Sequence, residues 1–147
     1  FGAFLGPFLI KPLGGNDPNR MRGVVVLGFV FQAVGYTIFA GSVGVGLWLA
    51  FFSLILAHLG GGINWTASAL LLQEVVPDHY RGRVFAIDLG ISSLTQAIST
   101  LLWSVALEIK VDPVWLALAG AVVWLAFGLG WGAWTRHMSL QPEPDAA

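Results

Sequence analysis

The chain has no cysteine and very little charge. The absence of cysteine excludes disulfide bonds and thiolate metal sites and leaves the redox compartment undetermined. Only 10% of the 147 residues are Asp, Glu, Lys or Arg, whereas soluble domains average about 25%. Hydrophobic residues make up 56%, and a spanning helix needs about 20 mainly apolar residues. The composition therefore argues against a water-soluble globule and predicts an all-α integral membrane protein with several spans.

The few charges are gathered in short stretches. Residues 23–73 and 89–107 contain no Asp, Glu, Lys or Arg. Between them, Gln73–Asp88 holds five charged side chains: Glu74, Asp78, Arg81, Arg83 and Asp88. A charged stretch between two uncharged runs predicts a tight loop that joins two membrane helices.

Segment lengths predict four full spans and the end of a fifth. Residues 1–10 would make about 15 Å of helix, half of a bilayer core. Residues 23–73 are too long for one span, so we divide them at the glycine-dense segment 41–46. Because the chain starts on this half-span with Phe1, we expect a C-terminal piece of a longer protein. The expected segments are about 1–10 (partial), 23–40, 46–76, 85–108 and 113–134, then a disordered cytoplasmic tail at 135–147.

Asp-Pro pairs and one further proline mark the helix ends. Asp17-Pro18 and Asp112-Pro113 each predict a helix start, because Asp caps free N–H groups and Pro fits the first turn. Pro77 predicts a helix end, because its ring cannot continue the hydrogen-bond ladder.

Basic residues predict the orientation. With alternating loops, six of the seven Lys and Arg fall on one side and only Lys110 on the other. The positive-inside rule makes the richer side cytoplasmic, including the C-terminus. We expect a multi-pass protein of the plasma membrane, in particular a bacterial inner membrane. The six residues are Lys11, Arg20, Arg22, Arg81, Arg83 and Arg136.

The motif at 74–86 resembles one in major facilitator superfamily transporters. Glu74, Pro77, Arg81 and Gly82 match the acid–Pro–Arg–Gly pattern between the tenth and eleventh helices of that family. The following R-V-F-A, residues 83–86, resembles the drug- and siderophore-export branch. The resemblance implies the C-terminal part of a twelve-helix bundle that transports a small molecule by alternating access.

The resemblance also implies a conformational switch in this loop. We expect it to involve Glu74, Pro77, Asp78, Arg81, Gly82 and Arg83. In this hypothesis Glu74 and Arg81 pair with each other and with Arg20 or Arg22 in one conformation only. The alternative is that the arginines are a static topology signal.

Polar residues at helical spacing predict a substrate cavity. Ser92, Gln96, Ser99, Thr100 and Trp103 lie on one helical face, and a shorter stripe precedes them. Such a face points either to a water-filled cavity or to a dry helix contact, and the resemblance implies the cavity. Gln32 and Tyr36 are expected to be packing groups. The full set of cavity candidates is His58, Asn64, Trp65, Ser68, Ser92, Gln96, Thr100 and Trp103.

His58 is the ionisable group predicted deepest in the membrane. It is either a proton carrier or a neutral histidine bonded to a neighbouring helix. We expect no catalytic residue, metal or cofactor beyond proton coupling. The leading function is secondary active export of a small amphipathic or hydrophobic compound that resembles a drug or a siderophore. The expected partners are the lipid bilayer, the missing N-terminal helices of the same transporter and the small-molecule substrate, and no nucleic acid is expected. The rival functions are a non-transporting membrane scaffold subunit and an integral membrane lipid-modifying enzyme.

Overall fold

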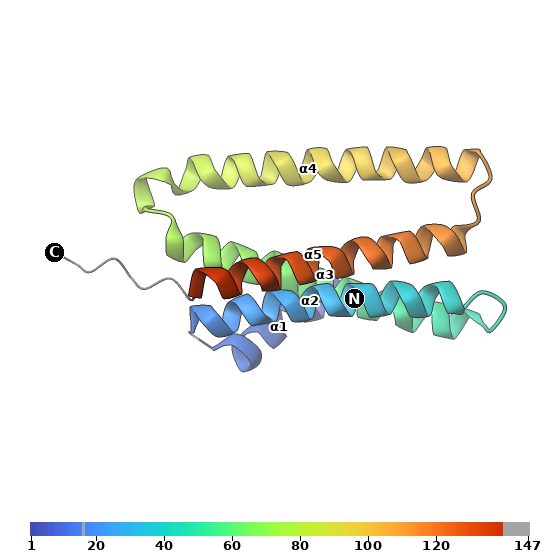
Figure 1. Ribbon diagram of the computed structural model, residues 1–147, viewed down its shortest axis with the longest axis horizontal. Helices are drawn as coiled ribbons and strands as arrows, with labels where there is room; N and C mark the ends of the chain where they lie inside the picture. The colour runs from blue at the N-terminus through green and yellow to red at the C-terminus, as the bar shows by residue number, and fades with distance from the viewer. Residues whose placement is uncertain (16, 140–147) are drawn as a thin grey trace.

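The computed structural model describes residues 1–15 and 17–139, which form helices and short connections without a strand. This confirms the all-α fold class. Four of the helices are long and apolar enough to cross a membrane by length and composition. The helices run side by side along one long axis (Figure 1): α1 (Gly2–Gly14), α2 (Pro18–Gly41), α3 (Leu47–Val75), α4 (Asp78–Glu108) and α5 (Pro113–Ser139).

Aspartate caps begin two of the long helices, as the Asp-Pro pairs predict. The Asp17 carboxylate accepts a hydrogen bond from the Asn19 N–H at 2.9 Å, and Asp112 accepts one from the Val114 N–H at 2.8 Å. The glycine-dense turn between α2 and α3 places Gly44 at φ 83°, in the left-handed region that glycine adopts without strain.

The connections are shorter than the predicted loops. The charged stretch 73–88 is not a loop: it is the end of α3 and the first turns of α4, joined by Val76 and Pro77. Helix α1 continues to Gly14 and ends at Gly15, whose φ of 58° stops the helix and whose N–H donates to the Lys11 carbonyl. Helix α5 continues to Ser139 instead of ending at 134, since no proline occurs before Pro142. The remainder of the expected tail, 140–147, lies outside the described residues.

Glycines allow α2 and α3 to approach closely. A methyl group on Gly60 of α3 would overlap the Gly28 carbonyl of α2, and one on Gly35 would lie 2.5 Å from the Ala57 nitrogen. A methyl group on Gly62 would overlap the Ala3 carbonyl of α1. Consecutive residues of a helix point about 100° apart. The glycine triplet 60–62 therefore serves two different helix contacts.

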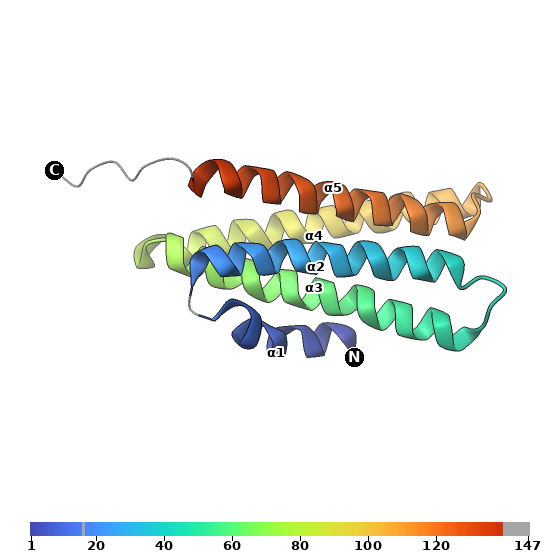
Figure 2. The same ribbon diagram turned by 60° about the horizontal axis from the view of Figure 1, so that its bottom comes forward.

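Helix α2 is the centre of the packed part of the bundle. It lies against α3 on one side and α5 on the other, while α1 covers α3 (Figure 2). The buried core is at the α1–α2–α3 junction and consists of Ile10, Met21, Val24, Val25, Ile63 and Ala67. Helix α4 buries no residue and is connected to this group mainly through its two ends.

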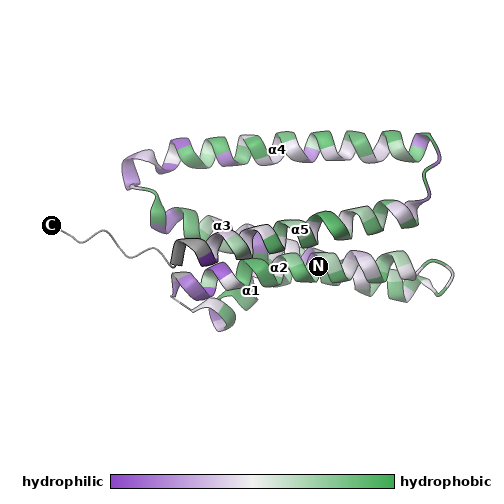
Figure 3. Cartoon of the chain, viewed as in Figure 1, coloured by the Kyte–Doolittle hydropathy of each residue, from purple (hydrophilic) through white to green (hydrophobic). Residues whose placement is uncertain are grey.

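Polar residues concentrate at the ends of the helices (Figure 3). The α1–α2 and α3–α4 connections and the C-terminal end of α5 lie at one end of the bundle, and the other two connections lie at the opposite end. The six basic residues that were predicted to share a side therefore share an end. Which side of the membrane this end faces stays a prediction.

Candidate functional site

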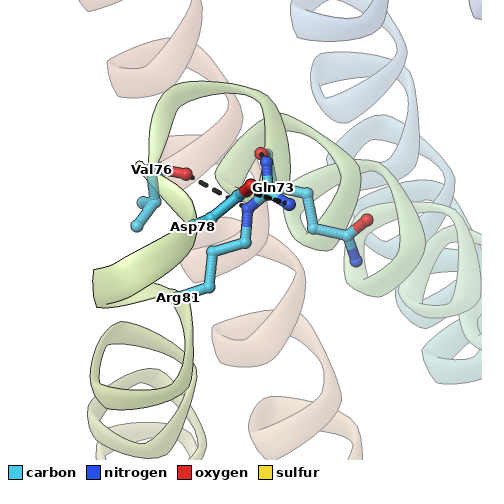
Figure 4. A network of polar contacts seen from close by, with 4 residues as sticks. All are labelled: Gln73, Val76, Asp78 and Arg81. Atoms are coloured by element: carbon cyan, nitrogen blue, oxygen red, sulfur yellow. Dashed lines mark hydrogen bonds and ion pairs between the residues drawn. The ribbon is translucent and has the colours of Figure 1, made fainter.

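Pro77 leaves a main-chain acceptor at the end of α3 without its usual donor. In a continuous helix the Gln73 carbonyl would accept the N–H of residue 77, and proline has none. Arg81, one turn into α4, supplies the missing donor. Its Nη2 donates to the main-chain carbonyl oxygen of Gln73 at 2.7 Å, and its Nε donates to the main-chain carbonyl oxygen of Val76 at 3.1 Å. Figure 4 shows the Arg81 side chain reaching back to the end of α3.

Asp78 is the ion-pair partner of Arg81. Its Oδ1 lies 2.7 Å from Arg81 Nη1. The expected pairing of Arg81 with Glu74 does not occur in this conformation, in which the guanidinium is engaged by Asp78 and by the Gln73 and Val76 main-chain carbonyls; that it forms in another conformation stays a prediction. In the part of the chain that the structure describes, Glu74 makes no ion pair; it shares a groove of about 360 Å³ with Arg22 of α2.

The remaining residues of the motif have no close partner within the described part of the chain. Arg83 is exposed. A methyl group on Gly82 would have no neighbour within 4 Å. Of the expected switch residues, Pro77, Asp78 and Arg81 thus form one network with α3, whereas Glu74, Gly82 and Arg83 stand apart from it.

A cavity of about 680 Å³ lies between α4 and the packed helices. Its wall from α3 includes Asn64, Trp65 and Ser68, and its wall from α4 includes Ser92 and Gln96. These five were expected in a substrate cavity, and the structure brings them together from two helices. Aromatic rings of Phe29, Phe85 and Trp124 complete much of the remaining wall.

Two amides occupy the inner wall of this cavity. Asn64 has both side-chain polar atoms buried without a hydrogen-bond partner, and its Oδ1 lies where a methyl group on Gly28 would be. Gln32 of α2 also lines the cavity and is only 6% exposed. A buried amide without a partner is costly. The polar atoms of Asn64 are covered by α2 in this conformation, so a ligand can satisfy them only after α2 and α3 move apart.

Sequence reasoning did not place Gln32 and Asp88 in this cavity. Gln32 was expected to be a packing group; it does pack against α3, and it also reaches the cavity beside Gly61. Asp88 was assigned to the loop. Its spacing contained the signal, because Asp88, Ser92 and Gln96 are four residues apart and so share one helical face.

Three of the expected cavity residues lie elsewhere. His58 is exposed on α3, and its Nδ1 lies 2.8 Å from the Leu54 carbonyl of its own helix. The Thr100 hydroxyl donates to the Gln96 carbonyl at 2.9 Å. Trp103 is 38% exposed, and its ring lies beside Gly120 of α5. The stripe therefore divides: its first part faces the cavity, and its later part does not line it.

The described residues contain no group of three His, Cys, Asp or Glu side chains close enough to hold a metal ion. The residues that line this cavity can bind a solute through hydrogen bonds, aromatic contacts and one carboxylate, and such binding requires no covalent bond to the solute.

Comparison with known proteins finds similarity to permeases. A protein of Neosartorya fischeri named "Probable quinate permease" is 31% identical over 137 residues, which is 82% of this chain and 25% of the relative. Two proteins of the same name from strains of Aspergillus fumigatus are 30% identical with the same coverage. The chain thus spans about a quarter of the length of the curated relatives it matches. No family model and no solved structure matches it.

These relatives bear on the expectations from the sequence. Together with the four long apolar helices, they identify the chain as a multi-pass membrane protein. Their name is that of permeases, and it gives no support to the drug- and siderophore-export branch that residues 83–86 suggested.

Proposed function

We propose that the chain is the C-terminal part of a secondary active transporter of the major facilitator type. It moves a small solute by alternating access through the cavity between α3 and α4. The observation that carries this proposal is that Asn64, Trp65, Ser68, Ser92 and Gln96 line one cavity. Transporters bind their substrates between helices near the midplane. The permease relatives support transport rather than enzymatic activity, and likewise rather than a scaffold role.

The lining favours a small solute with several hydroxyl groups. Gln32 and Gln96 offer amides, and Ser68 and Ser92 offer hydroxyls, beside flat aromatic rings. Polar groups placed at a few points of an otherwise apolar wall orient a small ligand. Quinate, named for the relatives, carries several hydroxyl groups; it also carries a carboxylate, which an ionised Asp88 would repel and a protonated Asp88 would not. Export of a drug- or siderophore-like amphipathic compound is the competing proposal, and transport assays separate the two.

Asp88 is our candidate for proton coupling. Among the lining residues that the structure describes, it is the one carboxylate and the one titratable side chain. No cation pairs with it in the described part of the chain. An ionisable residue in a membrane helix usually marks an ion or proton pathway. Asp88 replaces His58 in this role, because His58 does not line the cavity.

The α3–α4 junction supports the rocking motion of the transporter. Arg81 joins the end of α3 to the start of α4 through main-chain carbonyls, so the two cavity helices move as one unit while that network holds. When the Arg81 hydrogen bonds break, α4 can change its angle to α3 as the transporter opens to the other side of the membrane. We propose the plasma membrane as the location, with the end that carries Arg81 in the cytoplasm.

Transport by the intact protein in liposomes tests this function. We expect uptake of labelled quinate that is accelerated by an imposed proton gradient. The variant Asp88→Asn should lose most of this acceleration yet keep exchange of internal for external solute, which needs no net proton movement. Thr100→Val is the matched control on the same helix and should behave as the parent protein.

Two results would contradict the proposal. If Asp88→Asn showed the same gradient-driven uptake as the parent protein, Asp88 would have no role in coupling proton movement to solute uptake. Movement of an amphipathic cationic dye out of the liposomes, without any quinate uptake, would favour the export alternative.

A further inference from the structure

A second cavity, of about 730 Å³, lies between α2 and α5 at the end of the bundle that carries most basic residues. The two helices are antiparallel, so Arg22 of α2 and Arg136 of α5 lie near this end (Figure 1). Val26, Leu129 and Gly132 line the part that runs toward the middle of the helices. The cavity therefore has a cationic mouth and an apolar floor.

Arg22 is a partly buried cation without an acidic partner. Its Nη1 donates to the Asn19 side-chain oxygen at 3.3 Å, a neutral group. Among the described residues no carboxylate lies within ion-pair distance of it, whereas Arg20, on the same helix, lies 3.7 Å from Asp17. The Trp131 Nε1–H donates to the Arg22 carbonyl at 3.2 Å and so holds this turn of α2 against α5. A fixed, half-buried guanidinium is stabilised by an anion beside it.

We propose that this cavity binds an anionic phospholipid. The phosphate lies at the mouth with Arg22 and Arg136, and one acyl chain follows the apolar floor along Val26 and Leu129. Guanidinium groups bind phosphate oxygens in pairs, and basic pockets between membrane helices are known to hold anionic head groups. Val26 and Leu129 give this floor an apolar surface that suits an acyl chain. A free phosphate ion would leave that floor unused, so the lipid fits the whole cavity.

This site is separate from the proposed solute pathway. Both cavities have walls from α2 and α5, but they share no lining residue: this cavity is bounded by the ends of the two helices near Arg22 and Arg136, and the other by Trp124 together with α3 and α4. The bound lipid would hold α2 and α5 together at the end where Trp131 also donates to the Arg22 carbonyl.

Lipid retention by the intact protein, purified in neutral detergent, tests the proposal. Native mass spectrometry with added phosphatidylglycerol should show a bound lipid that phosphatidylcholine does not replace. The double variant Arg22→Gln, Arg136→Gln should bind phosphatidylglycerol about thirtyfold more weakly, which is about 2 kcal/mol at 1.4 kcal/mol per tenfold. The control pair Lys11→Gln, Arg20→Gln removes two charges from the same end outside the cavity and should bind as the parent protein.

A second variant keeps both arginines and fills the floor. Ala133 is exposed and lines the cavity, so Ala133→Phe should fold and should also weaken binding of phosphatidylglycerol. Unchanged binding in this variant, equal loss in the control pair, or equal retention of phosphatidylcholine would each overturn the proposal. Stabilisation by inorganic phosphate equal to that by phosphatidylglycerol would replace the lipid by a simple anion site and overturn it too.

Discussion

Replacing Arg81 by alanine should weaken the α3–α4 junction by a calculable amount. The change removes the donors to the Gln73 and Val76 carbonyls and the ion pair with Asp78. A hydrogen bond to a charged group contributes about 1.5–3 kcal/mol in a protein interior. The Arg81 side chain is 44% exposed, and solvent screening reduces such contributions. We therefore expect Arg81→Ala to lower the free energy of unfolding by about 1 kcal/mol.

The effect should depend on Pro77. Pro77→Ala restores an N–H at position 77 and frees Val76 to leave its extended conformation, φ −90° and ψ 123°; once Val76 is helical, that N–H donates to the Gln73 main-chain carbonyl. In this background the Gln73 oxygen no longer needs Arg81, so Arg81→Ala should cost about 0.5 kcal/mol less than in the parent protein. Denaturant unfolding of the intact protein in detergent, followed by tryptophan fluorescence, measures all four members of the cycle.

The control for this cycle is Arg83→Ala. Arg83 is an exposed arginine of the same segment and has no partner in the described structure, so its removal should change the free energy of unfolding by less than about 0.5 kcal/mol. An equal cost of Arg81→Ala in both backgrounds would refute the reasoning, because it would show that the carbonyl exposed by proline is irrelevant to the arginine.

Two further predictions concern packing and topology. Gly60→Ala should destabilise the protein strongly, by about 2 kcal/mol, since its methyl group would overlap the Gly28 carbonyl, whereas Gly130→Ala meets no neighbour within 4 Å and should be near neutral in the same unfolding assay. A cysteine at Asp78 should react with an impermeant thiol reagent only from the cytoplasm, and one at Lys110 only from outside; labelling of Asp78 from outside would reverse the orientation.

Helix number and helix starts could be predicted from the sequence, because they depend on local features. Charge-free length sets the number of spans, and the two Asp-Pro pairs cap helices through contacts two residues apart. The extent of the helices was harder to predict. Charge alone suggested a loop at 73–88, yet only Val76 and Pro77 interrupt the helices there.

The sequence could predict the cavity residues that share one face of a single helix. It could not predict those whose position depends on how two helices pack against each other. Ser92 and Gln96 follow from spacing on α4. The contribution of Gln32 depends on how closely α2 approaches the glycines of α3, which the sequence pattern of α2 does not show. The partners of Arg81 were missed for a related reason, since charges were matched with charges while a main-chain carbonyl needed the donor.

Water accessibility of Gln96 tests the central claim, that the cavity between α3 and α4 is the solute pathway. The chain has no cysteine, so a single cysteine at 96 can be introduced without background from these residues. In the intact protein it should react with a small impermeant thiol reagent, and added solute should slow the reaction. A cysteine at Leu94 or Leu101, both on α4 and outside the cavity lining, should stay unreactive. A cysteine at 96 that is as unreactive as one at 101 in every transport state would contradict the account and make the polar stripe a packing surface.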